Sequence, residues 1–276
     1  QVLSDGGFAF DTTLLDPNAH IKPGILEKTV KDTVWVKRIA PKARVNWGQR
    51  SPEGDLCPNR IAGCSNIAVA MAMLGLRYPS SIFITFSSSI KEKTLDWNSL
   101  KNHRSWDGEQ NICNCNSDLK HDISMLCRQL GEYAGTDYRS LSGSSTTLNG
   151  TSMCLLTLGF DVYGSDYEKG LISEKFTLNS EALVAGNRKQ DNGETVGHMW
   201  LCDGIRHYKL RYRHMISEDC GNTWRALYTD YSQEYIYHMY NWGWYGNSNG
   251  YFLDMDFKAD NGRNYNRKVK FFIVKN

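Results

Sequence analysis

Cys64 is the residue of this sequence best suited to nucleophilic chemistry. It lies in the stretch NRIAGCSNIAVAMAMLGLRYP, after a glycine and just before the run 66–76 of small and apolar residues. Such a run favours a helix, the lack of a polar face predicts a buried one, and Pro79 predicts where it ends. Because the N–H groups and macrodipole at a helix N-terminus favour an anion, this position would lower the pKa of the Cys64 thiol.

Three stretches distant from Cys64 in sequence carry the groups that a thiol nucleophile needs. His198, in GETVGHMWLCDGI, would form an imidazolium that pairs with the thiolate. Asn241, in MYNWGWYGNSNGYF, carries an amide oxygen that would accept the other imidazole N–H, and Trp242 would shield that bond from water. Gln49, in NWGQRSP, would donate its side-chain NH2 to a developing oxyanion, together with a backbone N–H near the cysteine.

Each of these residues alone has a simpler explanation. A single cysteine is more often a packed thiol, His198 beside Trp200 fits a buried strand, and an asparagine in a glycine-rich turn often serves a left-handed backbone. The combination is more informative, because Gln, Cys, His and Asn occur in this order. The histidine follows the cysteine by roughly 130 residues, which is the separation found in papain-like enzymes.

The elements that must position these residues change in kind along the chain. Apolar residues at helical spacing predict a second helix in SDLKHDISMLCRQLGEYAG, closed by Gly131 or Gly135, and a Ser/Thr cap predicts a third in SSTTLNGTSMCLLTLGF. After about residue 195, short aromatic stretches alternate and are separated by turn residues: HYKLRYRHM, WRALYTDY, EYIYHMYNWGW, GYFLDMDF and KVKFFIVK. These predict antiparallel strands, so the expected class is α+β, mainly helical first and mainly β later. KDTVWVKRI reads as a short strand or helix leading into the body.

The composition argues against several classes of function. A net charge of +2 with no block of basic residues argues against binding to nucleic acid or to an anionic membrane. No apolar run approaches the length of a membrane span. Eight cysteines are too few for a disulfide scaffold, and the closest pair, Cys113 and Cys115, has poor spacing for zinc. Most cysteines are therefore expected to be small buried hydrophobes, and neither a metal nor a cofactor is expected.

The motifs around the four polar residues resemble the streptopain family of bacterial papain-fold cysteine peptidases. That family carries a WGQ..P loop, a GC followed by a helix of small residues ending in YP, a GHAW..DGY strand and an NWGWGG..NGYF turn. Here they stand as WGQRSP, GCSNIAVAMAMLGLRYP, GHMWLCDGI and NWGWYGNSNGYF. The resemblance covers roughly residues 35–276. It departs from the family at Ser65 and Asn66, where small apolar residues are usual, and at Tyr245, where the turn usually has glycine.

The resemblance implies a papain-like two-lobed fold, with a mainly helical N-terminal lobe at about 50–160 and an antiparallel sheet or barrel at about 161–276. Residues 1–34 would be an N-terminal extension or the remnant of a pro-segment. The family further implies a secreted or cell-envelope enzyme, in the periplasm or associated with the outer membrane, made as a zymogen whose own N-terminal pro-domain inhibits it. By resemblance, Cys64 is the nucleophile, His198 the general base, Asn241 the orienting residue, Gln49 the oxyanion donor and Trp242 the shield.

The expected substrates are proteins or peptides, bound by Ser142, Gly143, Ser144 and Gly197. The segment 138–145 would form part of the wall of a pocket for an apolar side chain two residues before the cleaved bond, as the family prefers. The leading hypothesis is a secreted cysteine endopeptidase. Two alternatives remain open at this point: an inactive papain-fold module that binds peptides or proteins, and a papain-fold amidase or transglutaminase.

Overall fold

The computed structural model describes residues 25–87, 89–105 and 117–276. In these ranges the helices are α1 (Cys64–Leu76), α2 (Trp97–Asn102), α3 (Ser117–Ala134), α4 (Leu148–Thr157) and α5 (Leu171–Lys175). The strands are β1 (Leu26–Ile39), β2 (Ser81–Ile84), β3 (Lys91–Thr94), β4 (Asp161–Asp166), β5 (Ser180–Lys189), β6 (Thr195–Ser217), β7 (Arg225–Asn241), β8 (Gly250–Leu253) and β9 (Arg267–Lys275). None of the helices in these ranges has the length and apolarity that a membrane crossing requires.

The chain divides into two compact units. One is formed by the described residues up to Val34 together with Lys209–Gln233, and the other by Trp35–Tyr208 together with Glu234–Asn276. In the smaller unit, Asp32 accepts hydrogen bonds from Arg211, at 2.9 Å from Nε, and the ammonium group of Lys28 lies 3.8 Å from the ring centroid of Trp224. The residues predicted to do chemistry all belong to the larger unit.

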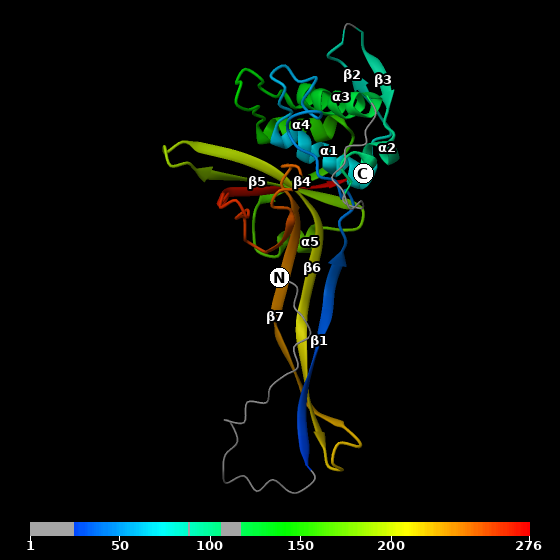
Figure 1. Ribbon diagram of the computed structural model, residues 1–276, viewed down its shortest axis with the longest axis vertical. Helices are drawn as coiled ribbons and strands as arrows, with labels where there is room; N and C mark the ends of the chain where they lie inside the picture. The colour runs from blue at the N-terminus through cyan, green and yellow to red at the C-terminus, as the bar shows by residue number, and fades with distance from the viewer. Residues whose placement is uncertain (1–24, 88, 106–116) are drawn as a thin grey trace. The chain divides into compact units, whose positions relative to one another are not determined.

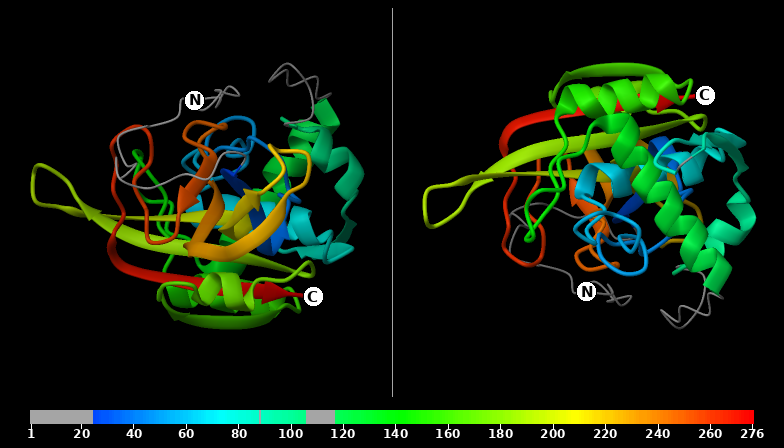
Figure 2. Two further views of the ribbon diagram at one scale, coloured as in Figure 1. Left: turned by 90° about the horizontal axis from the view of Figure 1, so that it is seen from below. Right: turned by 90° about the horizontal axis from the view of Figure 1, so that it is seen from above.

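The larger unit contains both helices and strands and is built on a large antiparallel sheet. The strand order is β4-β9-β5-β6-β7-β8, and β1 pairs with β6. β9 runs antiparallel to both β4 and β5, between which it lies in Figures 1 and 2. A separate hairpin is formed by β2 and β3.

Alternation along the central strands divides the core of this unit into two layers. Successive side chains of a strand point to opposite faces. On β5, Leu183 and Ala185 pack with helices α1, α3 and α4, while Ala182 and Val184 pack on the opposite face with the aromatic residues of β6, β7 and β9. The three helices lie together on one side of β4 and β5 in Figure 1. The sheet therefore separates a helical layer from a layer rich in aromatic side chains.

Three helix predictions are confirmed. The buried helix expected at 66–76 is α1, which begins slightly earlier, at Cys64, and buries ten of its 13 residues. The second is α3, followed by Gly135 in the left-handed region at φ +60°. The third is α4, where the Thr147 side chain accepts a hydrogen bond from the Gly150 N–H at 2.9 Å, as expected of an N-cap.

The prediction of many short strands after residue 195 was wrong for β6 and β7. The stretches 197–205 and 207–215 both belong to the single strand β6. Most of 224–231 and all of 234–241 belong to the single strand β7. No glycine or proline separates 205 from 207, or 231 from 234, so nothing in the backbone chemistry ends the strands there. The stretch KDTVWVKRI is part of the strand β1.

Most cysteines among the described residues are buried, as predicted. Cys57, Cys127, Cys154 and Cys202 are buried free thiols, and Cys220 is an exposed one. Cys113 and Cys115 lie outside the described residues, as does most of the predicted N-terminal extension.

Candidate active site

Cys64 opens helix α1, and Gly63 makes that position possible. Gly63 has φ +90° and ψ +146°, a conformation that residues with a Cβ rarely adopt, and a Cβ there would lie 3.3 Å from the Cβ of Ser144. The first helical hydrogen bond runs from the Ile67 N–H to the Gly63 carbonyl, at 3.1 Å. The N–H groups of the first turn are therefore free of helical partners, as the prediction for Cys64 required.

Opposing influences act on the Cys64 thiol. Burial raises its pKa, while the backbone N–H groups of Met199, Ser65 and Cys64 itself, and the Ser65 side chain, act to lower it. The balance leaves the pKa of the Cys64 thiol above its ordinary value. The predicted lowering by the helix N-terminus is thus outweighed by desolvation, because a thiolate loses more hydration than these few N–H groups return. A thiol in this environment needs a base to take its proton.

His198 lies on β6, opposite Gly186 of β5, and is 7% exposed. Its Nε2 lies 2.9 Å from the carbonyl oxygen of Trp242. Burial lowers the pKa of the His198 imidazole to about 4, partly offset by the Trp242 carbonyl, and the positive charge of Arg263 lowers it slightly further. The ring is therefore neutral at neutral pH.

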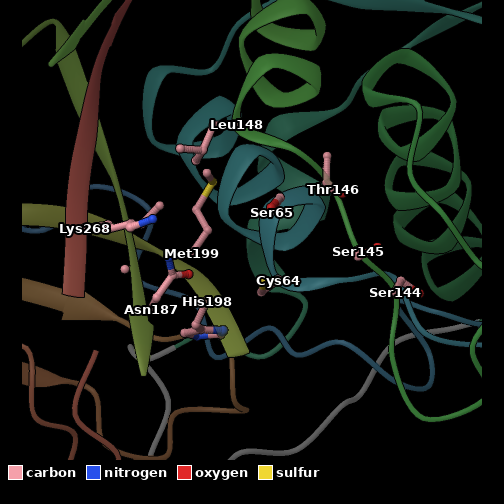
Figure 3. A pocket seen from close by; sticks show the side chains of 13 residues that line it. Cys64, Ser65, Ser144, Ser145, Thr146, Leu148, Asn187, His198, Met199 and Lys268 are labelled. Carbon is pink, nitrogen blue, oxygen red and sulfur yellow. The ribbon is translucent and has the colours of Figure 1, made fainter. Parts of the chain in front are cut away.

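The Trp242 carbonyl fixes which nitrogen of His198 carries the proton. A carbonyl oxygen only accepts hydrogen bonds, so Nε2 must be the protonated nitrogen of the neutral ring. Nδ1 then keeps its lone pair and is the nitrogen able to act as a base. Figure 3 shows His198 and Cys64 near one another at one end of a cavity, the histidine on its strand and the cysteine at the helix start.

Asn241 does not contact the imidazole in the way that the sequence predicted. Its Nδ2 donates to the Val45 carbonyl at 2.6 Å, and its Oδ1 accepts from the Gly243 N–H at 3.2 Å. The side chain is 1% exposed, and these two bonds commit it to the backbone of the turn. The imidazole of His198 is instead held by the backbone carbonyl of Trp242, the residue after Asn241. Asn241 holds the turn that carries this carbonyl.

Four aromatic rings pack around His198. Trp244 stacks on it at a centroid distance of 4.6 Å, and Trp242, which is fully buried, lies at 6.0 Å and is nearly parallel. Trp200 and Tyr265 complete the surroundings at 6.1 and 5.2 Å. These rings exclude water from the imidazole, which explains the low pKa of His198. Trp242 thus lies beside the histidine, as predicted. The hydrogen bond near its ring is the one that its own backbone carbonyl accepts from His198, and not one between Asn241 and His198.

Gln49 lies in the loop before α1 and lines a cavity that Cys64 and His198 also line. Its backbone carbonyl oxygen accepts a hydrogen bond from the Ala62 N–H at 2.7 Å, which ties the loop to the residues just before Cys64. The next residue is tied as well, because the Arg50 N–H donates to the Tyr245 hydroxyl at 2.6 Å. Tyr245 takes φ +57° where the similar streptopain motif usually has glycine, so the turn adopts a left-handed conformation with a side chain present.

Two cavities flank the Cys64–His198 pair. One, of about 340 Å³, is lined by Ser144, Thr146, Asn187 and Met199 among others, and Figure 3 shows these side chains around it. The other, of about 560 Å³, is lined by Gln49, Ser142, Gly143, Trp244 and Tyr245 among others. Cys64, Ser144, Gly197 and His198 line both. The structure therefore brings the predicted substrate-binding residues to the same cleft as the cysteine and the histidine.

Asn59 fixes the loop that forms one wall of this cleft. Its Nδ2 donates to the carbonyls of Ser140 and Gly143, at 2.7 and 3.1 Å, and lies 3.0 Å from the Ser144 hydroxyl oxygen. The Ser144 hydroxyl in turn donates to the Ile61 carbonyl at 2.6 Å. The wall is thereby attached to the segment that leads into Cys64.

The polar residues after Cys64 face the same wall. Ser65 and Asn66 are both buried. Asn66 Nδ2 donates to the Ala62 carbonyl at 2.7 Å and to the Thr136 hydroxyl at 3.1 Å. Asn66 thus links α1 to the segment beginning at residue 136, which leads into the wall, so its polarity serves packing at the cleft.

Sequence reasoning missed several lining residues. Trp244 was not predicted as a site residue, although it covers the imidazole and lines the larger cavity. Lys268 of β9, which was also not predicted as a site residue, lines the smaller cavity. A register shift between Ala185 and Asn187 of β5 occurs opposite this part of β9. A bulge of this kind re-aims side chains, and the alternation of residue types did not reveal it.

Comparisons with known proteins found a matching protein family and solved structures with a similar fold. The model of the peptidase C10 family matches residues 47–252. The fold is similar to that of active wild-type interpain A cysteine protease of Prevotella intermedia, with a TM-score of 0.60 and 18% identity over 86% of this chain and 95% of that chain. A fragment of prointerpain A of the same organism gives a TM-score of 0.54 and 17% identity over 87% of this chain and 72% of that chain. Comparison with curated protein sequences gave no match.

Proposed function

The chain belongs to the peptidase C10 family, the streptopain family of cysteine peptidases, and we propose that it cleaves peptide bonds within proteins through Cys64 and His198. Membership makes it a cysteine-type peptidase. One observation carries the assignment of residues: Cys64 and His198 line the same two cavities, and the Trp242 carbonyl occupies Nε2, so Nδ1 is left available as a base.

Acylation begins with a neutral pair. As Sγ of Cys64 attacks the carbonyl carbon of the scissile bond, its proton passes to Nδ1 of His198. The imidazolium formed is stabilised through Nε2–H by the Trp242 carbonyl. It then donates its proton to the nitrogen of the leaving amine as the C–N bond breaks, which leaves a thioester on Cys64 and a neutral ring.

The oxyanion formed during this step needs donors. We assign that role to the side-chain NH2 of Gln49 and to the backbone N–H of Cys64, which has no helical partner because it lies in the first turn of α1. The Gln49 loop is held by the Ala62 N–H on one side and, through Arg50, by Tyr245 on the other. Such restraint favours a donor that is already in position when charge develops.

Deacylation uses the same base. A water molecule attacks the thioester carbon while Nδ1 of His198 takes its proton, and the thiolate of Cys64 leaves and regains a proton from the imidazolium. The products are the carboxylic acid of one peptide segment and the free enzyme. Asn241 acts in both steps as a positioning residue, because its bonds to Val45 and Gly243 hold the turn that presents the Trp242 carbonyl.

The proposal includes a papain-like division into two lobes, a helical one at about 50–160 and a β-rich one at about 161–276, with residues 1–34 as an extension or pro-segment remnant. The separate helical and aromatic layers of the core are consistent with it. We also propose export from the cell, to the exterior or the cell envelope, and synthesis as a zymogen. The existence of a pro-form of interpain A supports the zymogen, with the protein's own pro-domain as inhibitor.

Cleavage of casein tests the proposed function. The protein should hydrolyse casein to internal fragments, and Cys64→Ala and His198→Ala should each abolish this. Cys220→Ala, which removes an exposed thiol of the smaller unit, should cleave at the normal rate. Rapid alkylation of Cys64 without proteolysis would instead favour an amidase or transglutaminase. Alkylation of Cys64 no faster than that of the other thiols would favour a binding module.

A further inference from the structure

The cleft around Cys64 and His198 is lined by cations without matching anions. Lys268 lines the smaller cavity, and Arg50, Arg188 and Arg263 line the larger one. No aspartate or glutamate is among the described residues lining either cavity. The whole chain is nearly balanced, with 32 basic and 30 acidic residues, so this absence of acidic residues is a local property of the cleft.

These four cations, the cleft cations, have no ion pair within the ranges that the structure describes. The contrast with their neighbours is clear on β9, where Lys270 pairs with Asp166 at 2.6 Å while Lys268 has no such partner there. Nε of Arg188 is buried and lacks a hydrogen-bond acceptor among the described residues. The charges that face the cleft are therefore not neutralised by the protein around them.

Two of the cleft cations lie against aromatic rings that border the catalytic histidine. The guanidinium carbon of Arg263 is 5.4 Å from the ring centroid of Trp244, and that of Arg188 is 5.8 Å from the ring centroid of Tyr265. Cation–π attraction of this kind holds a guanidinium near the ring, and its N–H groups can still donate hydrogen bonds. The free edge of an arginine binds a carboxylate through two parallel hydrogen bonds, which is stronger than a bond between neutral groups.

From this arrangement we infer that the enzyme selects acidic substrates, namely peptide segments that carry glutamate or aspartate close to the scissile bond on both sides. The inference takes the proposed function as given and specifies its substrate class. A cleft of one charge bordered by apolar walls concentrates ligands of the opposite charge. Lys268 would bind a carboxylate in the smaller cavity, and Arg188 and Arg263 would bind one in the larger.

Peptide binding to the inactive variant Cys64→Ala tests this preference without depending on turnover. Fluorescent peptides of one sequence, with glutamate or glutamine at the positions flanking the cleavage site, are compared by anisotropy. The glutamate peptide should bind more tightly by about fivefold per ion pair at low ionic strength, the upper end for a solvent-accessible pair. The ratio should fall as salt is raised, because salt screens such pairs.

Variants assign the preference to the cleft cations. Added to Cys64→Ala, Lys268→Gln and Arg263→Gln should each reduce the ratio of the two affinities, and the two changes together with Arg188→Gln should bring it close to one. Lys270→Gln is the matched control on the same strand, and it should leave the ratio unchanged because Lys270 already pairs with Asp166. Equal affinity for the two peptides, or a ratio that Lys268→Gln and Arg263→Gln leave intact, would overturn the inference.

Turnover by the wild-type protein separates this inference from the proposed function. If the glutamine peptide is cleaved as fast as the glutamate peptide, the peptidase assignment stands and the acidic preference is wrong. If the inactive variant binds the glutamate peptide selectively while the wild-type protein cleaves neither peptide, the preference stands and the proposed catalysis by Cys64 and His198 is wrong.

Discussion

Nε2 of His198 and the carbonyl oxygen of Trp242 are joined by a hydrogen bond of 2.9 Å, and this bond determines how the histidine can act. Since the carbonyl can only accept, the neutral ring keeps its lone pair on Nδ1. The partner of the imidazole is thus a backbone group, and a side-chain substitution at Trp242 would leave its carbonyl in place. The histidine itself is the residue through which this bond can be tested.

His198→Gln separates the hydrogen bond from the basicity. A glutamine amide can place an NH2 group near the position of Nε2 and keep the bond to the Trp242 carbonyl, but it offers no base. We expect kcat/KM to fall by about 10²–10⁴, the range for loss of a general base, while the unfolding temperature changes little. More than a tenth of wild-type activity in this variant would mean that His198 is not the base.

The acid limit of activity should reflect the buried imidazole. Burial lowers the pKa of His198 to about 4, so the ring is neutral and able to accept a proton at all pH values above this, and it is lost as a base only as pH falls through about 4. The acid limb of kcat/KM, which reports the free enzyme, should therefore lie well below the ordinary histidine pKa of about 6.5. A limb between pH 6 and 7 would show that His198 is more hydrated than the structure indicates.

Tyr245 should act on catalysis through the Gln49 loop. Tyr245→Phe removes the acceptor of the Arg50 N–H, at 2.6 Å, and frees the residue next to Gln49, the proposed oxyanion donor. Loss of one such hydrogen bond costs about 1 kcal/mol, so we expect kcat to fall about fivefold with little change in KM. Tyr231→Phe, an exposed tyrosine of the smaller unit, is the control. An equal loss in both variants, or a change confined to KM, would contradict a positioning role.

Close packing gives an independent check on Tyr245. A Cβ added to Gly48 would lie 2.2 Å from its ring, so Gly48→Ala alone should destabilise the protein. Combined with Tyr245→Gly, which removes the ring, the same change should cost much less. Denaturant unfolding of the four proteins of this double-mutant cycle measures the coupling.

Gly143 should control the room in the larger cavity. Nothing lies within 4 Å of a Cβ added at this position, so Gly143→Phe should fold normally and project into the cleft. We expect KM to rise for peptides that are bulky near the scissile bond, and the same for a bulky residue at Ser142. Unchanged kinetics would show that the loop 138–145 does not contact substrate.

Local chemistry made part of this fold predictable. Small apolar residues before Pro79 predicted α1, and the threonine cap predicted α4. The lengths of β6 and β7 were not predicted, because aromatic alternation was divided into segments where no glycine or proline actually interrupts it. Strand length depends on which neighbours are available for pairing, and a single sequence does not contain that information.

The sequence predicted the residue types of the site and their order along the chain, but it did not predict all the contacts between them. Gln49, Cys64 and His198 do line one cleft, as their local motifs suggested. The link from His198 to the Trp242 carbonyl was not predictable, because every residue has a carbonyl and the sequence gives no sign of which one faces the ring. The desolvation that keeps the pair neutral was equally hidden, since it arises from rings contributed by β6 and by the turn that follows β7.

Covalent labelling with a peptidyl epoxide, located by mass spectrometry, tests the central claim most directly. The account predicts a single adduct on Cys64, formed in step with the loss of proteolysis and much faster than on any of the seven other cysteines, and slowed strongly in His198→Gln. Labelling of Cys64 at the rate of the exposed Cys220, or at the same rate with and without the imidazole, would contradict a cysteine–histidine catalytic pair.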